Sequence, residues 1–385
     1  MTQQPADRQM VPSEDRYREE LAFLAAWDQG PKPPGWQLTP RAVVTFIVGS
    51  GADHLRLGGG TKTDGASSMR IGAKFIGDRG LIERCVVTLA GERGLMLVGE
   101  PGTAKSMLSE LLSASISGIS SLTVQGTAGT TEDHLRYGWN YALLLAKGPS
   151  PDALVPSPVL QAMRRGSVVR VEEVTRCLPE VQDALVSILS ERRIAVPELA
   201  GGDVDSTEYA APGFNVLATA NLRDRGVSEM SAALKRRFNF ELVEPIADRA
   251  AEIDLVKRQA TSRVEQTGAS FSVDDAVLEV LVTAFRDLRA GRTDEGWSVE
   301  RPSTVMSTAE AVSVASSLGI HAAYLGKDRD VLSTLPGHML GVVRKDDQLD
   351  QGRLLGYWDA VVKRRAESGN RTWRRLWELR SVIEG

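Results

Sequence analysis

One stretch limits the possible folds of this chain more than any other: LMLVGEPGTAKSMLSELL, from residue 95 to residue 112. An apolar segment ends at Gly99, an almost complete phosphate-binding pattern G-x-x-x-x-G-K-[ST] follows, and then an apolar-periodic segment begins. Strand, loop and helix in this order are the setting that the pattern requires. Ala104 takes the place of the second glycine, but it adds only one methyl group, and Gly102 supplies flexibility two residues earlier.

In such a loop, backbone N–H groups and the helix N-terminus receive phosphate oxygens. We predict that Lys105 neutralises the β- and γ-phosphates of a nucleoside triphosphate and that the Ser106 hydroxyl is a ligand of Mg²⁺. The alternative is an ordinary turn before a helix. The predicted nucleotide-binding residues of this segment are Glu100, Pro101, Gly102, Thr103, Ala104, Lys105, Ser106 and Met107.

A second motif is the run VVRVEE at residues 168–173, a β-branched strand that ends in two acids. Ligands gather at the carboxyl ends of parallel strands. We therefore predict that Glu172 holds Mg²⁺ and that Glu173 polarises the attacking water as general base. Aspartate is usual at the first place, so the additional methylene group of Glu172 leaves its coordination geometry open. The alternative is a pair of solvated acids at a strand end.

From about residue 76 the sequence alternates between helical and strand patterns. The predicted strands are 94–98, 121–125, 168–171, 214–219 and 238–243, and the predicted helices between them are 79–89, 105–115 and 180–190. Strands separated by helices indicate an α/β fold with a parallel sheet. After residue 245 the pattern is helical only, with predicted helices at 249–264, 274–290, 302–318 and 354–365.

The first 70 residues have a different character. Residues 1–12 are expected to be disordered, and helices are predicted at 13–29 and at 40–48, the second capped by Thr39. A Gly-rich linker follows at 57–68. We divide the chain into an N-terminal helical extension with linker (1–70), an α/β nucleotide-binding domain (71–245), a helical domain (246–345) and a C-terminal helical segment (346–385).

Composition excludes several classes of function. The hydrophobic fraction of 42% and the charged fraction of 25% are ordinary for a globular protein, and the formal net charge of −4 predicts no general affinity for nucleic acid. Cys85 and Cys177 form no disulfide framework or zinc spacing, which favours a reducing, cytoplasmic location. Neither a signal peptide nor a membrane span is expected, and the four histidines predict no metal site.

With these motifs in order, residues 75–345 resemble the AAA+ ATPases and, within them, the MoxR family. The run EEVTRCLPEVQDAL at 172–185 is similar to that family's D-E-I-N-R-A-x-P-x-x-Q-x-A-L block, departing at Glu172, Thr175 and Cys177. The family's loop commonly reads G-x-P-G-T-A-K-[ST], so Ala104 is the family's own variant. The resemblance implies an AAA+ P-loop domain with a parallel five-stranded sheet, a helical lid at 246–345, and ATP as the nucleotide.

The resemblance also assigns roles to polar residues further along the chain. Asn221, after the run ATA, is similar to sensor 1 and is expected between the strands of the loop and the acids, although Leu222 replaces a common proline. Arg237 falls at the place of the arginine finger, which acts on the neighbouring subunit's nucleotide. Arg236 replaces the usual aspartate, so the two arginines could share the role. The alternatives are a strand cap and a basic helix end.

Arg301 is similar to sensor 2, at the start of the helix predicted from Pro302, and the alternative is a solvated arginine. Ile76 and Gly77 resemble an element that packs near adenine. The resemblance also implies two insertions: a helix-2 insert between residues 125 and 168, and a hairpin over 194–203. In related rings such insertions face the pore or a partner. The alternative is that they only decorate the surface. Trp373 and Trp377, four residues apart, favour packing onto their own domain over a docking helix.

The resemblance implies a Mg²⁺-dependent ATPase that works as a homo-oligomeric ring, expected to be a hexamer, with a chaperone-like role. Such proteins remodel or activate a protein client, often with a von Willebrand factor A-domain (VWA) partner, and some help a metal or cofactor enter its target. One alternative is an ATP-gated assembly scaffold with weak turnover. Another is a helicase-type motor, against which the acidic net charge and the absence of a DNA-binding motif argue.

Overall fold

The computed structural model describes residues 10–57, 67–199, 206–221, 228–326, 330–345, 347 and 349–384. By their contacts these fall into two units, one drawn from 1–99 and 104–243 and the other from 100–103 and 244–385. Most of the predicted disorder at 1–12, the linker at 58–66, the hairpin tip at 200–205 and Leu222 lie outside the described residues. The division into four domains stays a prediction.

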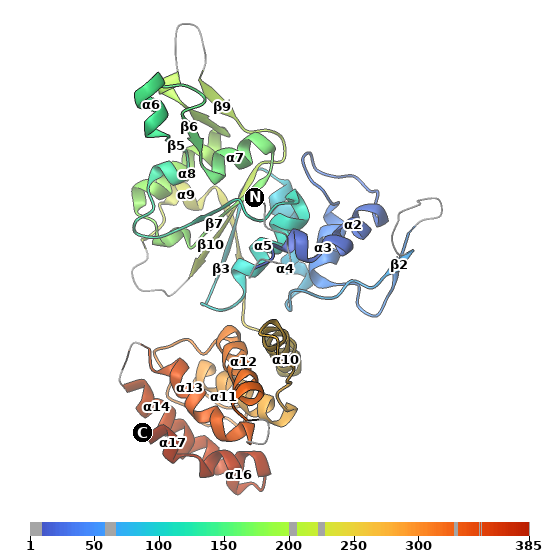
Figure 1. The fold of residues 1–385 in the computed structure, drawn as a ribbon, viewed down its shortest axis with the longest axis vertical. Helices are drawn as coiled ribbons and strands as arrows, with labels where there is room; N and C mark the ends of the chain where they lie inside the picture. Colours follow the sequence, from blue (N-terminus) through green and yellow to red (C-terminus); the bar gives the residue numbers. More distant parts are fainter. Residues whose placement is uncertain are drawn as a thin grey trace. The chain divides into compact units, whose positions relative to one another are not determined.

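The first unit is built on a five-stranded sheet in the order β11-β3-β10-β7-β4, in which every neighbouring pair is parallel (Figure 1). Its strands are β3 (Gly94–Gly99), β4 (Thr123–Gln125), β7 (Val168–Glu172), β10 (Asn215–Asn221) and β11 (Phe238–Leu242). The predicted strands agree with these within two residues at each end. The prediction of an α/β fold with a parallel five-stranded sheet is therefore confirmed.

Alternating side chains of the strands divide between the two faces of this sheet, as the period of a strand requires. Leu95 and Leu97 of β3 join one core with the helices α3 (Pro40–Val48), α4 (Arg79–Ala90) and α5 (Lys105–Ser117). Met96 and Val98 join the opposite core with α7 (Pro158–Arg165) and α8 (Pro179–Glu191). Because both faces are covered, the inner strands β3 and β10 are buried almost throughout, whereas the edge strands β4 and β11 are only partly buried.

The N-terminal segment contributes to the first of these cores. The single helix predicted at 13–29 is wrong: α1 (Ser13–Arg16) and α2 (Arg18–Trp27) are separated at Tyr17, whose ring packs edge-on against Phe46. Helix α3 begins where predicted, with Thr39 Oγ1 accepting a hydrogen bond of 3.1 Å from the N–H of Ala42. The strands β1 (Leu55–Arg56) and β2 (Ser68–Met69) pair at the two ends of the predicted linker.

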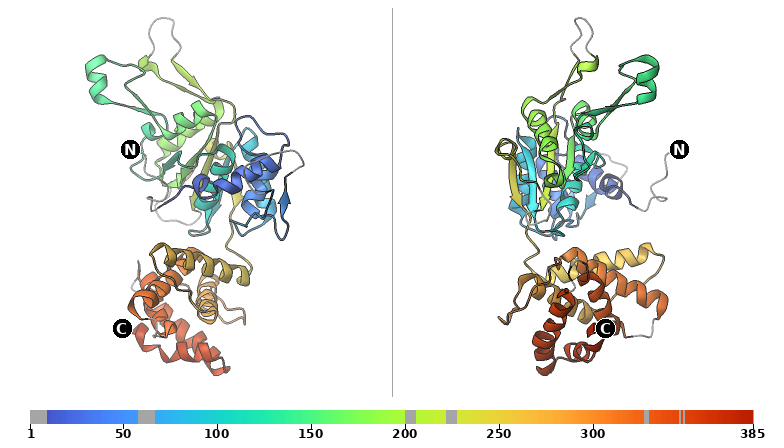
Figure 2. Two further views of the ribbon diagram at one scale, coloured as in Figure 1. Left: turned by 45° about the vertical axis from the view of Figure 1, so that its right-hand side comes forward. Right: turned by 90° about the vertical axis from the view of Figure 1, so that its left-hand side faces the viewer.

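Two antiparallel arms extend from the sheet unit in the same direction, and Figure 2 shows both in profile. One arm pairs β5 (Tyr137–Trp139) with β6 (Leu154–Pro156) around α6 (Tyr141–Lys147), and the other pairs β8 (Arg193–Ala195) with β9 (Thr207–Tyr209). They lie in the segments predicted as the helix-2 insert and as the hairpin over 194–203, although β9 begins beyond residue 203. That they face a pore or a partner stays a prediction. Helix α6 has no buried residue, and its Leu145 side chain is 89% exposed.

The second unit is helical and has its own core. Its elements are α10 (Arg249–Gln266), α11 (Asp275–Ala290), α12 (Thr308–Leu325), η5 (Val331–Thr334), α13 (Leu335–Val343), α14 (Leu349–Tyr357), the π-helical turn η6 (Trp358–Val362), α15 (Lys363–Glu367), α16 (Arg371–Glu378) and α17 (Ser381–Glu384). The predicted start of a helix at Pro302 is wrong, since α12 begins at Thr308. Ser307 caps it by accepting a hydrogen bond from the N–H of Glu310.

The aromatic pair near the C-terminus belongs to this core. Trp373 is buried and Trp377 is half-buried against the same cluster of apolar side chains. The guanidinium of Arg365 lies 4.7 Å from the ring of Trp373. The prediction that this stripe packs onto its own domain is confirmed. Among the described residues, no helix has both the length and the apolar composition that crossing a membrane requires.

Candidate active site

The loop between β3 and α5 has the backbone conformation of a phosphate-binding turn. Gly102 and Ala104 both adopt left-handed conformations, with φ of 78° and 66°, and Thr103 Oγ1 donates to the carbonyl of Glu100 over 3.0 Å. A left-handed alanine costs about 1–2 kcal/mol relative to a helical one, and such outliers concentrate at functional sites. Lys105 Nζ donates to the carbonyl of Gly99 over 3.2 Å, so the ammonium lies beside the loop.

The strand register brings the carboxyl ends of three strands to one edge of the sheet. Asn221 of β10 is level with Gly99 of β3, and Ala218 of β10 is level with Val171 of β7. Thr219 therefore lies beside Glu172, and β10 separates the strand of the loop from the strand of the acids. The predicted position of Asn221 between those strands is confirmed. Its hydrogen bond to water or to a γ-phosphate stays a prediction.

Glu172 is the centre of the polar cluster at this edge. Its side chain is buried, and its Oε2 accepts hydrogen bonds of 2.8 Å from Ser106 Oγ and 2.8 Å from Thr219 Oγ1. Its Oε1 accepts from Ser109 Oγ over 2.5 Å and from the guanidinium of Arg170 over 2.7 Å. Ser106 and Glu172, the two residues predicted to hold Mg²⁺, are thus in direct contact.

This environment determines the charge of Glu172. Burial raises the pKa of the carboxyl, but the charge of Arg170 and the hydroxyl groups of Ser109, Thr219 and Ser106 act in the opposite direction and prevail, so that its pKa is lowered. The carboxylate is therefore ionised at neutral pH. An ionised carboxylate and a serine hydroxyl are both oxygen ligands of the kind that Mg²⁺ takes.

The donor set suits Mg²⁺, which takes oxygen ligands and is commonly held by one or two protein groups together with substrate phosphates. Ser106 Oγ and Glu172 Oε2, two oxygen atoms that could both be metal ligands, lie 2.8 Å apart at the N-terminus of α5. Among the described residues, no cluster of three or more His, Cys, Asp or Glu side chains is placed to enclose a metal ion. The described residues thus offer two oxygen ligands at this point, and the binding of Mg²⁺ there stays a prediction.

Glu173 is held in an unusual backbone conformation directly after this pair. Its φ is 52°, its N–H donates to Thr219 Oγ1 over 2.9 Å, and its Oε2 forms a 2.7 Å ion pair with Arg176. A Cβ atom on Gly126 would lie only 2.3 Å from the carbonyl oxygen of Glu173, so this neighbour has to be glycine. Thr219 and Gly126 therefore both restrain the turn after β7. The left-handed backbone of Glu173 gives its side chain a different direction from that of Glu172.

Three side chains of this cluster are absent from the sequence-based prediction: Ser109, Arg170 and Thr219. Ser109 follows Ser106 by one helical turn, so the two share a face of α5. Arg170 precedes Glu172 by two residues on β7, and Thr219 likewise precedes Asn221 on β10, which places each pair on one face of its strand. These spacings are visible in the sequence, but the neighbourhood of β7 and β10 is not.

The two candidate finger arginines differ in how they are held. Arg237 donates through Nε to Ser190 Oγ of α8 and through Nη1 to the carbonyl of Ala233 over 2.7 Å, and its Nη2 takes part in neither bond. Ala233 belongs to the short helix α9 (Ala232–Lys235). Arg236 is exposed. The restrained guanidinium favours Arg237 over Arg236, and the role of each stays a prediction.

The remaining predicted residues lie in less specific settings. Arg301 Nη2 donates over 2.6 Å to the carbonyl of Ala290, at the C-terminal end of α11, and opens no helix. Ile76 is half-buried and Gly77 lies against the ring of Phe75, both before α4. Met107, in the first turn of α5, packs against the α4 side of the sheet. Nothing in these contacts assigns Arg301 or Ile76 to a nucleotide.

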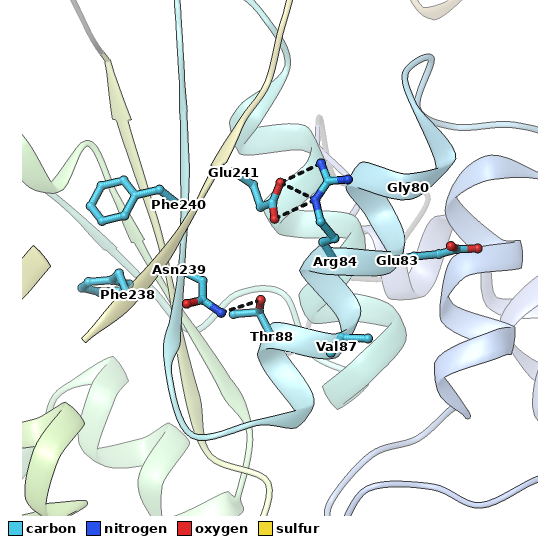
Figure 3. Close-up of a pocket in the computed structure, with 9 residues that line it drawn as sticks. All are labelled: Gly80, Glu83, Arg84, Val87, Thr88, Phe238, Asn239, Phe240 and Glu241. Carbon is cyan, nitrogen blue, oxygen red and sulfur yellow. Dashed lines mark hydrogen bonds and ion pairs between the residues drawn. The ribbon is translucent and has the colours of Figure 1, made fainter. Parts of the chain in front are cut away.

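A pocket elsewhere in the first unit contains none of these residues. It lies between α4 and the edge strand β11, where Arg84 Nη2 pairs with Glu241 Oε2 over 2.9 Å and Asn239 Nδ2 donates to Thr88 Oγ1 over 3.1 Å (Figure 3). Arg84 and Glu241 neutralise each other, and Glu83, the third charged residue of the lining, pairs with Arg79 over 2.7 Å. The loop and acid cluster, at the carboxyl edge of the sheet, remains the better candidate site.

Two family models match separate parts of this chain. The family model described as AAA domain (dynein-related subfamily) matches residues 94–238, and the one described as YehL-like AAA+ ATPase C-terminal domain matches residues 250–384. A relative named Uncharacterized protein YehL, from Escherichia coli (strain K12), is 47% identical over 368 residues, which cover 96% of each chain. Uncharacterized protein SH1500, from Staphylococcus haemolyticus, is 27% identical over 197 residues, 51% of this chain and 68% of the relative.

Among solved structures, NtrX from Brucella abortus is similar in its complexes with ADP and with ATP. The ADP complex has a TM-score of 0.46 and 15% identity, covering 80% of this chain and 64% of that chain. The ATP complex has a TM-score of 0.48 and 13% identity, covering 81% and 70%.

Proposed function

This chain belongs to the YehL-like AAA+ ATPases, and we propose that it hydrolyses Mg²⁺-bound ATP in a homo-oligomeric ring to remodel or activate a partner protein. The observation that carries the proposal is the contact between Ser106 Oγ and Glu172 Oε2 over 2.8 Å, because it joins the phosphate loop to the acids at one point. Beside it, Lys105 and the N-terminus of α5 offer positive charge to phosphate oxygens.

The residues of the cluster divide the chemistry among them. Lys105 would bind the β- and γ-phosphates, while Ser106 and Glu172 would hold Mg²⁺, which supplies neutralisation of the charge that develops on those oxygens. Glu173 would accept the proton of the attacking water, and Asn221 would orient that water. Arg237 would reach the γ-phosphate bound by the neighbouring subunit, so that hydrolysis depends on assembly.

The finer proposal is a MoxR-like, cytoplasmic hexamer with a chaperone-like role, a VWA-domain partner and tasks such as metal or cofactor insertion. The motif at 172–185 supports it, as do the two arms. Helix α6 exposes Tyr141 and Leu145, 72% and 89% accessible, and apolar side chains of this kind suit a protein partner. The net charge of −4 argues against nucleic acid as the partner.

A specific observation also favours a second candidate, an ATP-gated assembly scaffold with weak turnover. Glu172 already accepts hydrogen bonds from Ser106, Ser109, Thr219 and Arg170, so Mg²⁺ would have to displace at least the bond from Ser106 before it could bind. Such a chain would bind ATP and assemble, and it would release phosphate slowly.

Measuring ATP hydrolysis at several protein concentrations distinguishes the ring ATPase from the assembly scaffold. Phosphate release per subunit should rise with protein concentration over the range in which sedimentation shows the ring forming, because the finger comes from the next subunit. A ring that assembles with ATP but shows no concentration-dependent release indicates the scaffold. Full activity of a monomer would contradict the ring mechanism altogether.

A further inference from the structure

A buried arginine touches the acid that would bind Mg²⁺. Arg170 lies on β7 two residues before Glu172, on the same face of the strand, and is only 9% exposed. Its Nε donates to Ser109 Oγ over 2.9 Å and to Glu172 Oε1 over 3.1 Å, and its Nη2 donates to the same Oε1 over 2.7 Å. Both nitrogens of the fork thus hold a single carboxylate oxygen.

The rest of the guanidinium is anchored to backbone. Nη1 donates to the carbonyl of Ser120 over 3.1 Å, and Nη2 also donates to the carbonyl of Ser106 over 3.2 Å. The second of these carbonyls belongs to the residue whose hydroxyl contacts Glu172. Arg170 therefore fixes the distance between the start of α5 and the end of β7, which are the two elements that carry the predicted metal ligands.

The two oxygens of Glu172 have separate partners as a result. Oε1 receives the bonds from Arg170 and Ser109, whereas Oε2 receives those from Ser106 and Thr219. A glutamate has one more rotatable bond than an aspartate, so it has more conformations in which neither oxygen faces the loop. Fixing Oε1 removes that freedom and leaves Oε2 beside Ser106.

We propose that Arg170 is a positioning residue for the metal site: it holds Oε1 of Glu172, so that Oε2 alone is presented at Ser106 and a glutamate can serve where an aspartate is usual. The inference rests on the proposed function, since the orientation of Glu172 matters only if Mg²⁺ and ATP bind there. Arg170 would act through Glu172, to which it donates. Its planar fork and fixed charge suit this task better than lysine would.

The test measures the Mg²⁺ concentration required for half-maximal binding of a fluorescent ATP analogue, together with binding of the analogue in EDTA. Arg170→Met is expected to raise the required Mg²⁺ concentration about tenfold, which corresponds to the loss of one hydrogen bond to a charged group. Binding in EDTA should stay within about twofold, because Lys105 and the loop are unchanged. Combining Arg170→Met with Glu172→Asp should lower the required Mg²⁺ concentration most of the way back, because the shorter aspartate does not need Arg170 to hold one of its oxygens.

Two further variants keep the test decisive if Arg170→Met folds poorly. Arg170→Lys preserves the charge but not the fork, and Ser109→Ala removes the other donor to Oε1; each should raise the Mg²⁺ requirement by a smaller factor. The matched control is Arg365→Met, which removes another buried arginine, paired with Asp287 over 2.7 Å in the helical unit. It should lower thermal stability and leave the Mg²⁺ requirement unchanged.

The outcomes are distinguishable. If folded Arg170→Met and Ser109→Ala proteins need no more Mg²⁺ than the unaltered protein, the proposed positioning role of Arg170 is refuted. The same holds if binding with Mg²⁺ and binding in EDTA fall equally, because that indicates a purely structural role. If the unaltered protein binds no analogue under either condition, the proposed function itself has failed.

Discussion

Replacing Glu173 by glutamine is expected to slow ATP hydrolysis by about 10²–10⁴-fold while ATP binding stays near that of the unaltered protein. Glutamine has the same shape as glutamate and cannot accept a proton from water at neutral pH. The backbone of residue 173 should keep its left-handed turn, because its N–H bond to Thr219 Oγ1 and the close approach of Gly126 do not involve the side chain. The loop at Lys105 is untouched.

Phosphate release under saturating ATP, with binding of the nucleotide measured on the same preparation, checks this prediction. The matched control is Glu180→Gln, an exposed glutamate in the first turn of α8 that contacts no residue of the cluster and should leave turnover unchanged. If Glu173→Gln protein released phosphate at the normal rate, another group would have to be the base. A rate already very low in the unaltered protein would favour the scaffold.

Replacing Arg237 by alanine is expected to reduce hydrolysis about 10³-fold or more, since an arginine supplied by a neighbouring subunit is typically worth this much in phosphoryl transfer. The side chain is preorganised by its bonds to Ser190 and Ala233, and its Nη2 is outside both. Arg236→Ala should have a much smaller effect because that side chain is exposed and unrestrained by these contacts. ATP binding per subunit should be preserved in both variants.

Mixing variants shows whether the arginine acts between subunits. Arg237→Ala subunits keep their phosphate loop, and Lys105→Ala subunits keep their arginine, so rings containing both should regain part of the activity that each lacks alone. Recovery of Arg237→Ala subunits with an affinity-tagged Lys105→Ala subunit confirms that mixed rings have formed. Mixed rings no more active than either parent would show that Arg237 is not a finger, and a larger loss from Arg236→Ala would transfer the role to its neighbour.

The fold could be predicted because its signals are local. The alternation of strand and helix, the loop with Lys105 and Ser106, and the acids after Val171 all lie within short windows of sequence. Where two local signals competed, the prediction failed. Proline is a frequent first residue of helices, which suggested a start at Pro302, but Ser307 supplies the cap that starts α12. Likewise, nothing in the apolar pattern of 13–29 shows the break at Tyr17.

The site could be predicted only in part, because half of the cluster depends on which strands are neighbours. Thr219 reaches Glu172 only because β10 lies between β3 and β7, and that order is a long-range property of the sheet. Arg170 would pass in the sequence for an ordinary charged residue on a strand, and its burial against Ser109 and Ser120 gives it a role. Conversely, the position of Arg301 before Pro302 resembles sensor 2, but its side chain donates a hydrogen bond to the C-terminal end of α11.

Calorimetric titration of ATP into the unaltered protein and into Lys105→Ala, with Mg²⁺ and with EDTA, measures whether Lys105, Ser106 and Glu172 bind one triphosphate. The unaltered protein should bind more tightly with Mg²⁺. Lys105→Ala should bind about 10–100-fold more weakly, the equivalent of losing one or two charge-assisted hydrogen bonds. Lys257→Ala, on the exposed face of α10, should bind normally. Equal affinity of Lys105→Ala and the unaltered protein would contradict a triphosphate site at this loop.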